Sequence, residues 1–174
     1  KLIIVMTSLR INFEDIDVIV FDFDGVLTNN LVYIDQSGIE TVRCSRADGI
    51  AFEFFSKKSK PTFIISTEKN PVVSMRAKKL NVPVIQGSSD KISSLNKVLD
   101  DNGYDINKTL FVGNDINDYA VMKKCGYSAC PADSHGVIKE IATVVLESKG
   151  GSGVARELLE KIFGINILES LYTG

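Results

Sequence analysis

Short apolar segments alternate with helix-like segments along this chain, and this alternation constrains the fold more than any other feature of the sequence. The composition of buried β-strands occurs within 17–23, 61–66, 82–87, 109–115 and 142–147. Helical patterns occur within 47–58, 70–80, 89–101, 116–124, 134–141 and 153–163. This alternation predicts an α/β fold, a Rossmann-like doubly wound parallel sheet with right-handed crossovers.

Two segments fall outside this pattern. Residues 31–42 have the pattern of a β-hairpin whose turn lies at 35–38. The glycine-rich stretch "KGGSGVARE" at 149–157 is predicted to be the only flexible segment. The chain does not begin with methionine, which is compatible with a domain excised from a longer protein. The boundaries we assign are an N-terminal extension at 1–14, a single domain at 15–165 and a C-terminal tail at 166–174.

Composition and charge argue against several classes of function. The net charge is −2 without a dense Lys/Arg cluster, which argues against nucleic-acid binding. No apolar run is long enough to span a bilayer, and "KLIIVM" is too short for a signal peptide. The single histidine, His135, and the three cysteines have no zinc-ligand spacing. We therefore expect a cytoplasmic protein with reduced thiols at Cys44, Cys125 and Cys130.

Polar side chains gather where the predicted strands end. In "VIVFDFDGVLTNN" (18–30), Asp22 and Asp24 follow an apolar strand, and positions i and i+2 share a face. Open parallel sheets bind ligands at the carboxyl ends of their strands, so other residues at this edge join the two aspartates. These are Ser66 and Thr67 after the second buried strand, and Asn114, Asp115 and Asp118 after "TLFVG".

This group of side chains predicts a magnesium site with phosphoryl chemistry. Clustered carboxylates repel each other unless a cation lies among them. Carboxylate and amide oxygens without His or Cys suit Mg²⁺, which commonly pairs with phosphate. One carboxylate can act as the nucleophile and a second as general acid/base. Ser66 and Lys91, which opens a helix after "QGSSD", are available to hold phosphoryl oxygens.

Four motifs of this chain resemble those of the haloacid dehalogenase (HAD) superfamily of phosphohydrolases. They are "DFDGVLT", the hydroxyl of Ser66, Lys91 after "QGSSD", and "GNDINDYAVM" at 113–122, and the resemblance covers about 15–165. It implies that Asp22 attacks phosphorus, that Asp24 is the general acid/base, and that Ser66 and Lys91 hold the phosphoryl group. The metal ligands it implies are Asp22, the Asp24 carbonyl, Asn114 and Asp115, supported by Asp118. Many members have Asp where this chain has Asn114.

Too few residues separate the first motif from the first long helix to form a cap domain. This pattern, with "IQGSSDK" and "GGSGVARELLEKIFG", resembles capless phosphatases of 3-deoxy-octulosonate 8-phosphate and of nine-carbon, sialic-acid-type 9-phosphates. The resemblance implies a homotetramer in which hairpins associate and a neighbour's C-terminal segment closes each site. It also implies a small phosphorylated sugar acid as substrate.

Nonulosonate-type members resemble this chain in the stretch "STEKNPVVSMRAKKL" at 66–80. Three of its residues, Glu68, Arg76 and Lys79, match residues that face the sugar acid in those members. Arg46 stands where some relatives carry an acid and could clamp a carboxylate or phosphate. The substrate-binding candidates are Thr28, Arg46, Thr67, Glu68, Arg76, Lys79 and Arg156.

The main hypothesis is therefore a Mg²⁺-dependent phosphatase of a nonulosonate 9-phosphate, an activity of sialic acid biosynthesis. One alternative is a phosphatase of the eight-carbon 8-phosphate, because fold analogy does not settle the substrate. Another is a non-catalytic oligomerisation or regulatory domain of an acylneuraminate cytidylyltransferase, to whose phosphatase-like domain this chain also bears a resemblance. The presence of Asp22 argues against a domain without activity. An alternative interpretation of the basic side chains in 70–80, and of Arg156, is that they are solvated surface charges.

Overall fold

The computed structural model describes residues 11–172, with side chains through residue 169. Six parallel strands form its central sheet in the order β5-β4-β1-β6-β7-β8. They are β1 (Val18–Phe21), β4 (Thr62–Ile65), β5 (Val84–Ile85), β6 (Thr109–Val112), β7 (Tyr127–Cys130) and β8 (Val144–Val145). The predicted α/β fold with a parallel sheet is confirmed.

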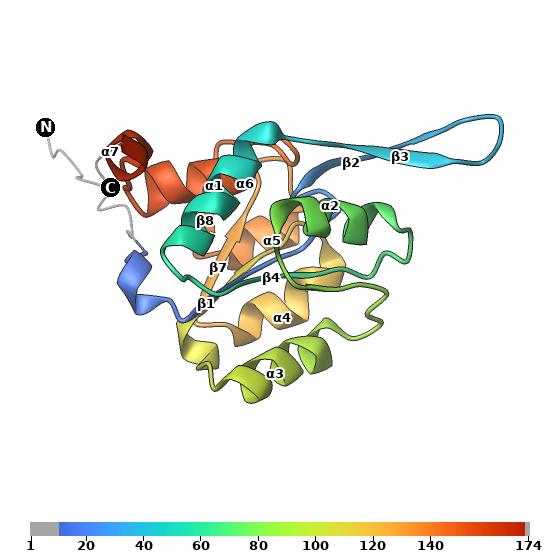
Figure 1. Cartoon of the computed structure of the whole chain (residues 1–174). Helices are drawn as coiled ribbons and strands as arrows, with labels where there is room; N and C mark the ends of the chain where they lie inside the picture. The colour runs from blue at the N-terminus through green and yellow to red at the C-terminus, as the bar shows by residue number, and fades with distance from the viewer. Residues whose placement is uncertain (1–10, 173–174) are drawn as a thin grey trace, which may run out of the picture.

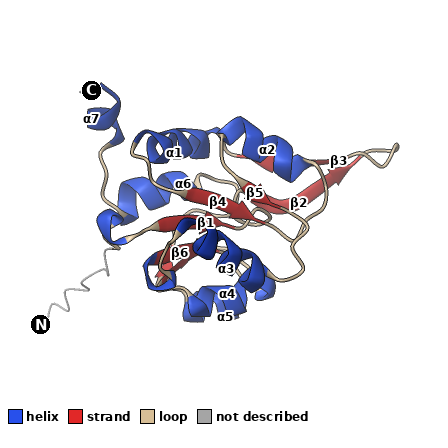
Figure 2. Cartoon of the chain, turned by 60° about the horizontal axis from the view of Figure 1, so that its bottom comes forward, coloured by secondary structure: helices blue, strands red, loops and turns tan. Residues whose placement is uncertain are grey.

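Helices cover both faces of this sheet (Figures 1 and 2). One apolar core joins the sheet to α1 (Arg46–Lys57), α2 (Val72–Leu80) and α6 (Val154–Glu157), which continues as the π-helical turn η4 (Leu158–Ile162). The second core joins the opposite face to α3 (Lys91–Asn102), α4 (Tyr119–Lys124) and α5 (Gly136–Ile141). All four residues of β1 are fully buried, which explains why this strand is a continuous apolar run.

The predicted hairpin is present and projects from the body of the domain (Figure 1). It consists of β2 (Thr28–Ile34) and β3 (Glu40–Cys44), which pair antiparallel. Its turn lies where the sequence predicts it: Asp35 Oδ1 accepts hydrogen bonds from the amides of Ser37 and Ile39, at 2.8 and 2.9 Å. Within the described residues, this hairpin is the only insertion between β1 and α1, so there is no cap domain there.

The prediction that 149–157 is flexible is wrong. Gly150, Gly151 and Gly153 are buried, and α6 begins at Val154. Asp133 accepts the amide of Gly150, and Asp48 accepts the amides of 155 and 156, so this segment is held through its backbone. Two glycines in sequence favour a flexible loop, but they also permit another backbone to approach closely, and here the second effect applies.

The ends of the chain take part in packing more than the predicted boundaries imply. Ile11 is buried in the core beside the 3₁₀ turn η1 (Phe13–Asp15). The predicted tail contains α7 (Ile167–Tyr172), whose Ile167 is buried in the same core. The remainder of the predicted N-terminal extension, 1–10, lies outside the described residues.

Two further findings bear on the function classes considered above. Among the described residues, no helix has the length and apolar character needed to cross a membrane. Cys44, Cys125 and Cys130 are free thiols.

Candidate active site

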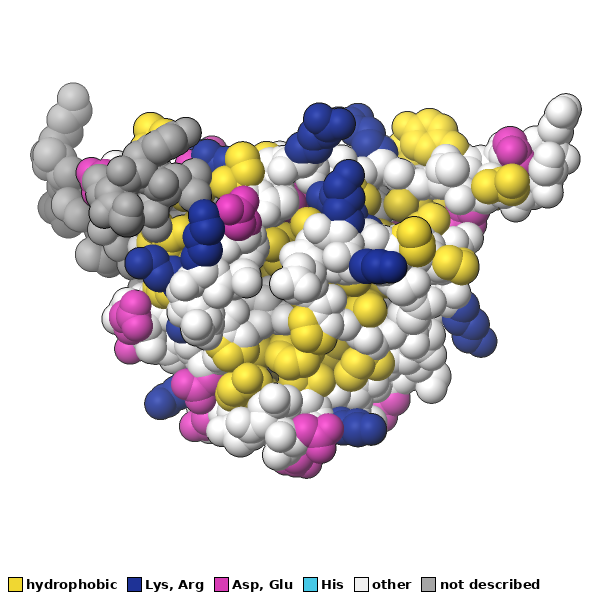
Figure 3. Space-filling view, viewed as in Figure 1, with side chains coloured by type: hydrophobic (Ala, Val, Ile, Leu, Met, Phe, Trp, Pro, Cys, Tyr) yellow, Lys and Arg dark blue, Asp and Glu magenta, His cyan; other side chains and the backbone are white. Residues whose placement is uncertain are grey.

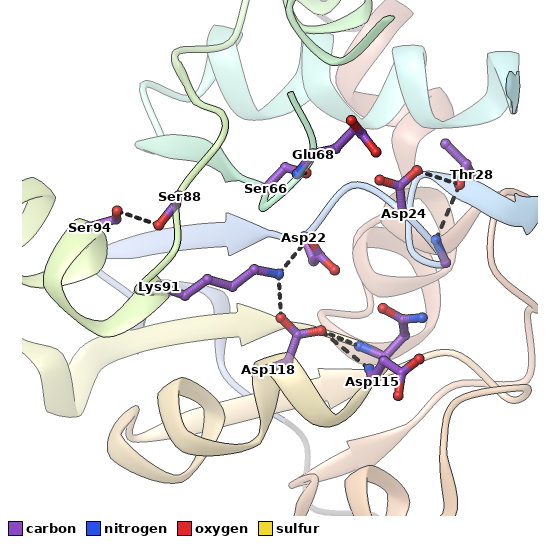
Figure 4. Close-up of polar contacts among 12 residues, drawn as sticks. Asp22, Asp24, Thr28, Ser66, Glu68, Ser88, Lys91, Ser94, Asp115 and Asp118 are labelled. Atoms are coloured by element: carbon purple, nitrogen blue, oxygen red, sulfur yellow. Dashed lines mark hydrogen bonds and ion pairs between the residues drawn. The ribbon is translucent and has the colours of Figure 1, made fainter. Parts of the chain in front are cut away.

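The predicted site residues come together because their strands are neighbours in the sheet. Asp22 and Asp24 follow β1, which lies between β4 and β6. Ser66 follows β4, and 114–118 follow β6. Figure 4 shows their side chains converging at this edge, with Lys91 reaching in from the start of α3.

Lys91 forms the centre of a buried ion-pair cluster. Its Nζ lies 2.7 Å from Asp22 Oδ1 and 2.6 Å from Asp118 Oδ1. Asp22 is 3% exposed and Lys91 4% exposed. Asp90 caps α3 by accepting hydrogen bonds from the amides of Ile92 and Ser93, which fixes where the helix, and hence Lys91, begins. The charge that clusters here is thus partly balanced by the protein itself.

The electrostatics of the cluster follow from burial and from these pairs. Burial, together with the charge of Asp118, raises the pKa of Asp22 to about 7, against the lowering effect of Lys91. Burial disfavours the charged form of Lys91, but the two carboxylates outweigh it and raise the pKa of Lys91. Lys91 therefore remains a cation beside the candidate nucleophile.

Asp118 links this cluster to the loop that follows β6. Its Oδ2 accepts hydrogen bonds from the amides of Asn114 at 2.8 Å and Asp115 at 3.3 Å. A Cβ atom at Gly113 would lie 2.6 Å from the Asp118 Cβ, so glycine is needed at this position. Asp115 is half-buried, and its Oδ1 accepts the amide of Ile116. Its carboxylate therefore caps the turn η3 (Ile116–Asp118).

Asp24 lies in the turn between β1 and β2, and Thr28 holds that turn. The Thr28 hydroxyl donates to Asp24 Oδ1 at 3.5 Å and accepts the amides of Gly25 and Asn30 at 3.2 Å each. Burial and the nearby charge of Glu68 raise the pKa of Asp24, which favours a protonated acid. Thr28, predicted to bind substrate, is fully buried and supports the turn.

Asn114 completes a set of oxygen atoms suited to a hard cation. Its side-chain amide faces Asp22 Oδ2 and the Asp24 carbonyl, and these are acceptors. With its oxygen turned toward them, three oxygens converge without a donor; with its nitrogen turned toward them, it donates at 3.3 and 2.8 Å. A cation such as Mg²⁺ would satisfy the first arrangement.

This ligand set includes only one carboxylate side chain. Accordingly, the described residues contain no cluster of three or more His, Cys, Asp or Glu side chains that could hold a metal.

A Cβ atom at Gly25 would overlap the Asn114 side chain, and Gly25 has φ +78°. Glycine at this position therefore lets Asn114 approach the Asp24 carbonyl.

The remaining predicted residues occupy different places around the site. Ser66 is buried at the end of β4, and its hydroxyl accepts the amide of Glu68 at 3.1 Å. Glu68 Oε1 accepts two further amides, those of 69 and 70, at 2.6 and 2.7 Å. Figure 4 shows Glu68 near Asp24. Thr67 is exposed.

The predicted cations fall into two groups. Arg46, Arg76 and Lys79 line a cavity of about 400 Å³ between α1 and α2. Basic side chains cluster at this side of the molecule in the space-filling view (Figure 3). Arg156 does not join them: its guanidinium pairs with Glu160 on the same helical segment at 2.7 Å.

Sequence reasoning missed the contact between the glycine-rich segment and the catalytic turn. A Cβ atom at Gly150 would lie 2.2 Å from the Gly25 carbonyl oxygen, and the Gly151 amide donates to the Val26 carbonyl at 2.9 Å. The pair Gly150-Gly151 just before a helix was the available indication, because glycine pairs also mark close backbone contacts.

Comparison with known proteins agrees with the geometry. Residues 58–158, more than half of the chain, match the family of haloacid dehalogenase-like hydrolases. The 3-deoxy-D-manno-octulosonate 8-phosphate phosphatase of Salmonella typhimurium is 30% identical over 148 residues, which cover 84% of this chain and 79% of that protein.

Two solved structures share this fold. A Streptomyces avermitilis protein described as an HAD family hydrolase is 36% identical, with a TM-score of 0.89, and the match covers 92% of each chain. The 3-deoxy-D-manno-octulosonate 8-phosphate phosphatase of Yersinia pestis is 28% identical, with a TM-score of 0.82, covering 85% of this chain and 80% of that one. The predicted superfamily is confirmed: this chain belongs to the haloacid dehalogenase-like hydrolases, in a form without a cap domain.

Proposed function

We propose that this protein is a Mg²⁺-dependent phosphatase that hydrolyses the phosphomonoester of a 3-deoxy sugar acid. The observation that carries this proposal is the convergence of Asp22, Asp24 and Asn114 on one point, beside the buried Lys91–Asp118 pair. Mg²⁺ is proposed from this oxygen set, and it would draw charge from the phosphoryl oxygens when bound.

The chemistry assigned to the side chains proceeds in two displacements. In the first, a carboxylate oxygen of Asp22 forms a bond to phosphorus while the bond from phosphorus to the substrate oxygen breaks. Asp24 gives its proton to the departing alkoxide. In the second, Asp24 takes a proton from water, whose oxygen attacks phosphorus and releases the Asp22 carboxylate and inorganic phosphate. Ser66 and Lys91 hold the phosphoryl oxygens in both steps.

The eight-carbon substrate, 3-deoxy-D-manno-octulosonate 8-phosphate, has the stronger support. It is the substrate in the names of the Salmonella and Yersinia relatives. The preference for a nine-carbon substrate drawn from the sequence has less support than this alternative, because none of the relatives compared carries that activity in its name.

A nine-carbon nonulosonate 9-phosphate remains the second candidate, favoured by residues along α2 and the loop before it. Glu68 lies near Asp24, and Arg76 and Lys79 line the cavity between α1 and α2. Arg76 Nη2 donates to the Ser45 carbonyl at 2.7 Å, whereas its buried Nε has no partner among the described residues. A guanidinium that lines this cavity and has a donor left unpaired could bind the carboxylate of a longer sugar acid.

A direct comparison of the two substrates tests the proposal. The purified chain is assayed for phosphate release from the eight-carbon 8-phosphate and the nine-carbon 9-phosphate, with Mg²⁺ and with EDTA. We expect Mg²⁺-dependent release, with the higher kcat/KM for the eight-carbon substrate. A higher value for the nine-carbon substrate would reverse the assignment of substrate. No release from either would contradict the proposed function.

We also propose that the enzyme works as a homotetramer. The hairpin exposes large apolar side chains, and a two-stranded hairpin is marginally stable alone. The exposed fractions are 61% for Leu31, 51% for Val32, 55% for Tyr33, 66% for Ile34 and 60% for Ile39. Association of hairpins around a symmetry axis would bury these side chains.

A further inference from the structure

The catalytic turn that carries Asp24 is held from both sides. On one side is the Asn114 side chain, which would overlap any Cβ atom at Gly25. On the other side is the backbone of Gly150 and Gly151. A Cβ atom at Gly150 would lie 2.2 Å from the Gly25 carbonyl oxygen and 2.8 Å from the Thr28 carbonyl oxygen. The turn therefore has no room to move toward either neighbour.

Gly151 also contacts this turn closely, and its contact includes a hydrogen bond. Its amide donates to the Val26 carbonyl at 2.9 Å. A Cβ atom there would lie 2.6 Å from the Asn29 amide nitrogen, and φ is +66°. Both positions therefore require glycine. At Gly150 the reason is the close contact, and at Gly151 it is the close contact together with the backbone conformation.

Three carboxylates hold the segment that provides these glycines. Glu157 accepts the amides of 147 and 148 at 2.9 and 2.6 Å. Asp133 Oδ1 accepts the Gly150 amide at 2.9 Å. Asp48, from α1, accepts the Ala155 amide at 2.9 Å and the Arg156 amide at 3.4 Å. The segment 147–156 is therefore fixed at its start, at the contact glycine and at its end.

We propose that the segment 147–156 is a brace that sets the position of Asp24. In this proposal, Gly150 and Gly151 are positioning residues that act through the backbone of 25–29, and Asp133 is the anchor that places Gly150. The proposal deepens the proposed function and rests on it, because Asp24 is the group that moves protons in both displacements. Asp24 also presents its backbone carbonyl toward Asn114.

The brace predicts a specific kinetic effect. Gly150→Ala pushes the Gly25 carbonyl away and displaces Asp24, and a displacement of about 1 Å can cost about 100-fold in rate. We therefore expect kcat to fall by about 100-fold while KM changes by less than about threefold, because the brace does not contact substrate. Proton donation matters less for a good leaving group, so kcat/KM should fall more for a sugar acid phosphate than for p-nitrophenyl phosphate.

Matched variants separate this effect from a general loss of structure. Gly136→Ala is the control, because no atom lies within 4 Å of a Cβ there. Asp133 is exposed, so its variants are expected to fold. Asp133→Ala removes the acceptor for the Gly150 amide, whereas Asp133→Asn keeps an oxygen that can accept it. We expect kcat to fall by about tenfold in Asp133→Ala and to recover in Asp133→Asn, since Asp133→Ala removes only one hydrogen bond of the brace.

Amide hydrogen exchange of 23–29 provides a readout that needs no substrate. The amides of this turn should exchange faster in Asp133→Ala than in the wild type, and Asp133→Asn should restore the wild-type rate. A folded Gly150→Ala variant with wild-type kcat would overturn the proposal. The proposal would also be overturned if Asp133→Ala and Asp133→Asn had the same kcat and the same exchange rates. This second test applies even if Gly150→Ala does not fold. If the wild type releases no phosphate, the proposed function fails, and exchange alone still decides whether the brace exists.

Discussion

At the scale of single residues, the buried aspartates Asp22 and Asp48 lie in different surroundings. Asp22 has Lys91 as a cationic partner at 2.7 Å. Asp48 is equally buried, but it accepts hydrogen bonds only from backbone amides. Its Oδ2 has no partner among the described residues. Burial, only partly offset by these amides, raises the pKa of Asp48 to about 6. The charge on Asp48 therefore opposes folding at neutral pH, which the chain tolerates because Asp48 caps α6.

This gives a prediction about stability and pH. Between its ordinary pKa of 3.8 and about 6, Asp48 binds more protons in the folded than in the unfolded state. Its contribution to the free energy of unfolding therefore decreases as pH rises through this range. Asp48→Asn does not titrate and keeps an acceptor for the Ala155 amide. The free energy of unfolding of Asp48→Asn, measured relative to that of the wild type, should therefore rise by on the order of 3 kcal/mol between pH 4 and pH 7.

Urea denaturation at several pH values, in EDTA, measures this difference. Asp100→Asn, at an exposed position of α3, is the control and should show no such gain. A stability difference between Asp48→Asn and wild type that stays constant with pH would contradict the assignment.

At the scale of elements, α2 carries two of the residues proposed to bind the sugar acid, Arg76 and Lys79. Arg76→Ala or Lys79→Ala should lower kcat/KM for the sugar acid phosphate by about 30-fold, because losing one partner of a charge-assisted pair costs about 2 kcal/mol. Hydrolysis of p-nitrophenyl phosphate should be nearly unchanged, because Asp22, Asp24, Ser66 and Lys91 remain. Lys78→Ala, an exposed neighbour on α2, is the matched control.

Steady-state kinetics with both substrates distinguish three outcomes. A loss confined to the sugar acid phosphate supports the specificity role. A parallel loss with both substrates would show that these residues support the fold or the metal site. No loss with either would make the basic side of α2 a solvated surface.

The elements also show what sequence alone can predict. β1 was predictable because a strand buried on both faces is apolar throughout. The residues after β1 and β4 were predictable because parallel strands end at one edge. The pairing of Lys91 with Asp118 was not, because it depends on where α3 and η3 meet in space. The roles of Gly150 and Gly151 were predicted wrongly, because glycine serves both flexible loops and close contacts. α7 was missed because its packing depends on the burial of Ile167 against a distant core.

At the scale of the whole molecule, the projecting hairpin should determine the assembly. Ile34 and Leu31 are the most exposed large apolar side chains of the hairpin. Light scattering on the wild type should report a tetramer, and the double variant Leu31→Asp/Ile34→Asp should be a smaller species with the same fold by circular dichroism. The reason is that a carboxylate at a buried apolar contact carries a large desolvation cost. A wild-type protein that is monomeric at micromolar concentration would defeat this prediction.

Asp22 is proposed as the nucleophile of a Mg²⁺-dependent phosphatase, and the roles proposed for Asp24, Ser66 and Lys91 depend on it. The most direct measurement is phosphate release from the eight-carbon sugar acid phosphate by wild type and by Asp22→Asn, each with Mg²⁺ and with EDTA. Asn keeps the size and polarity of Asp22 but has no charged oxygen to attack phosphorus. We expect Mg²⁺-dependent release by the wild type and a loss of several orders of magnitude in a folded Asp22→Asn. Near-normal Mg²⁺-dependent release by Asp22→Asn would contradict the mechanism.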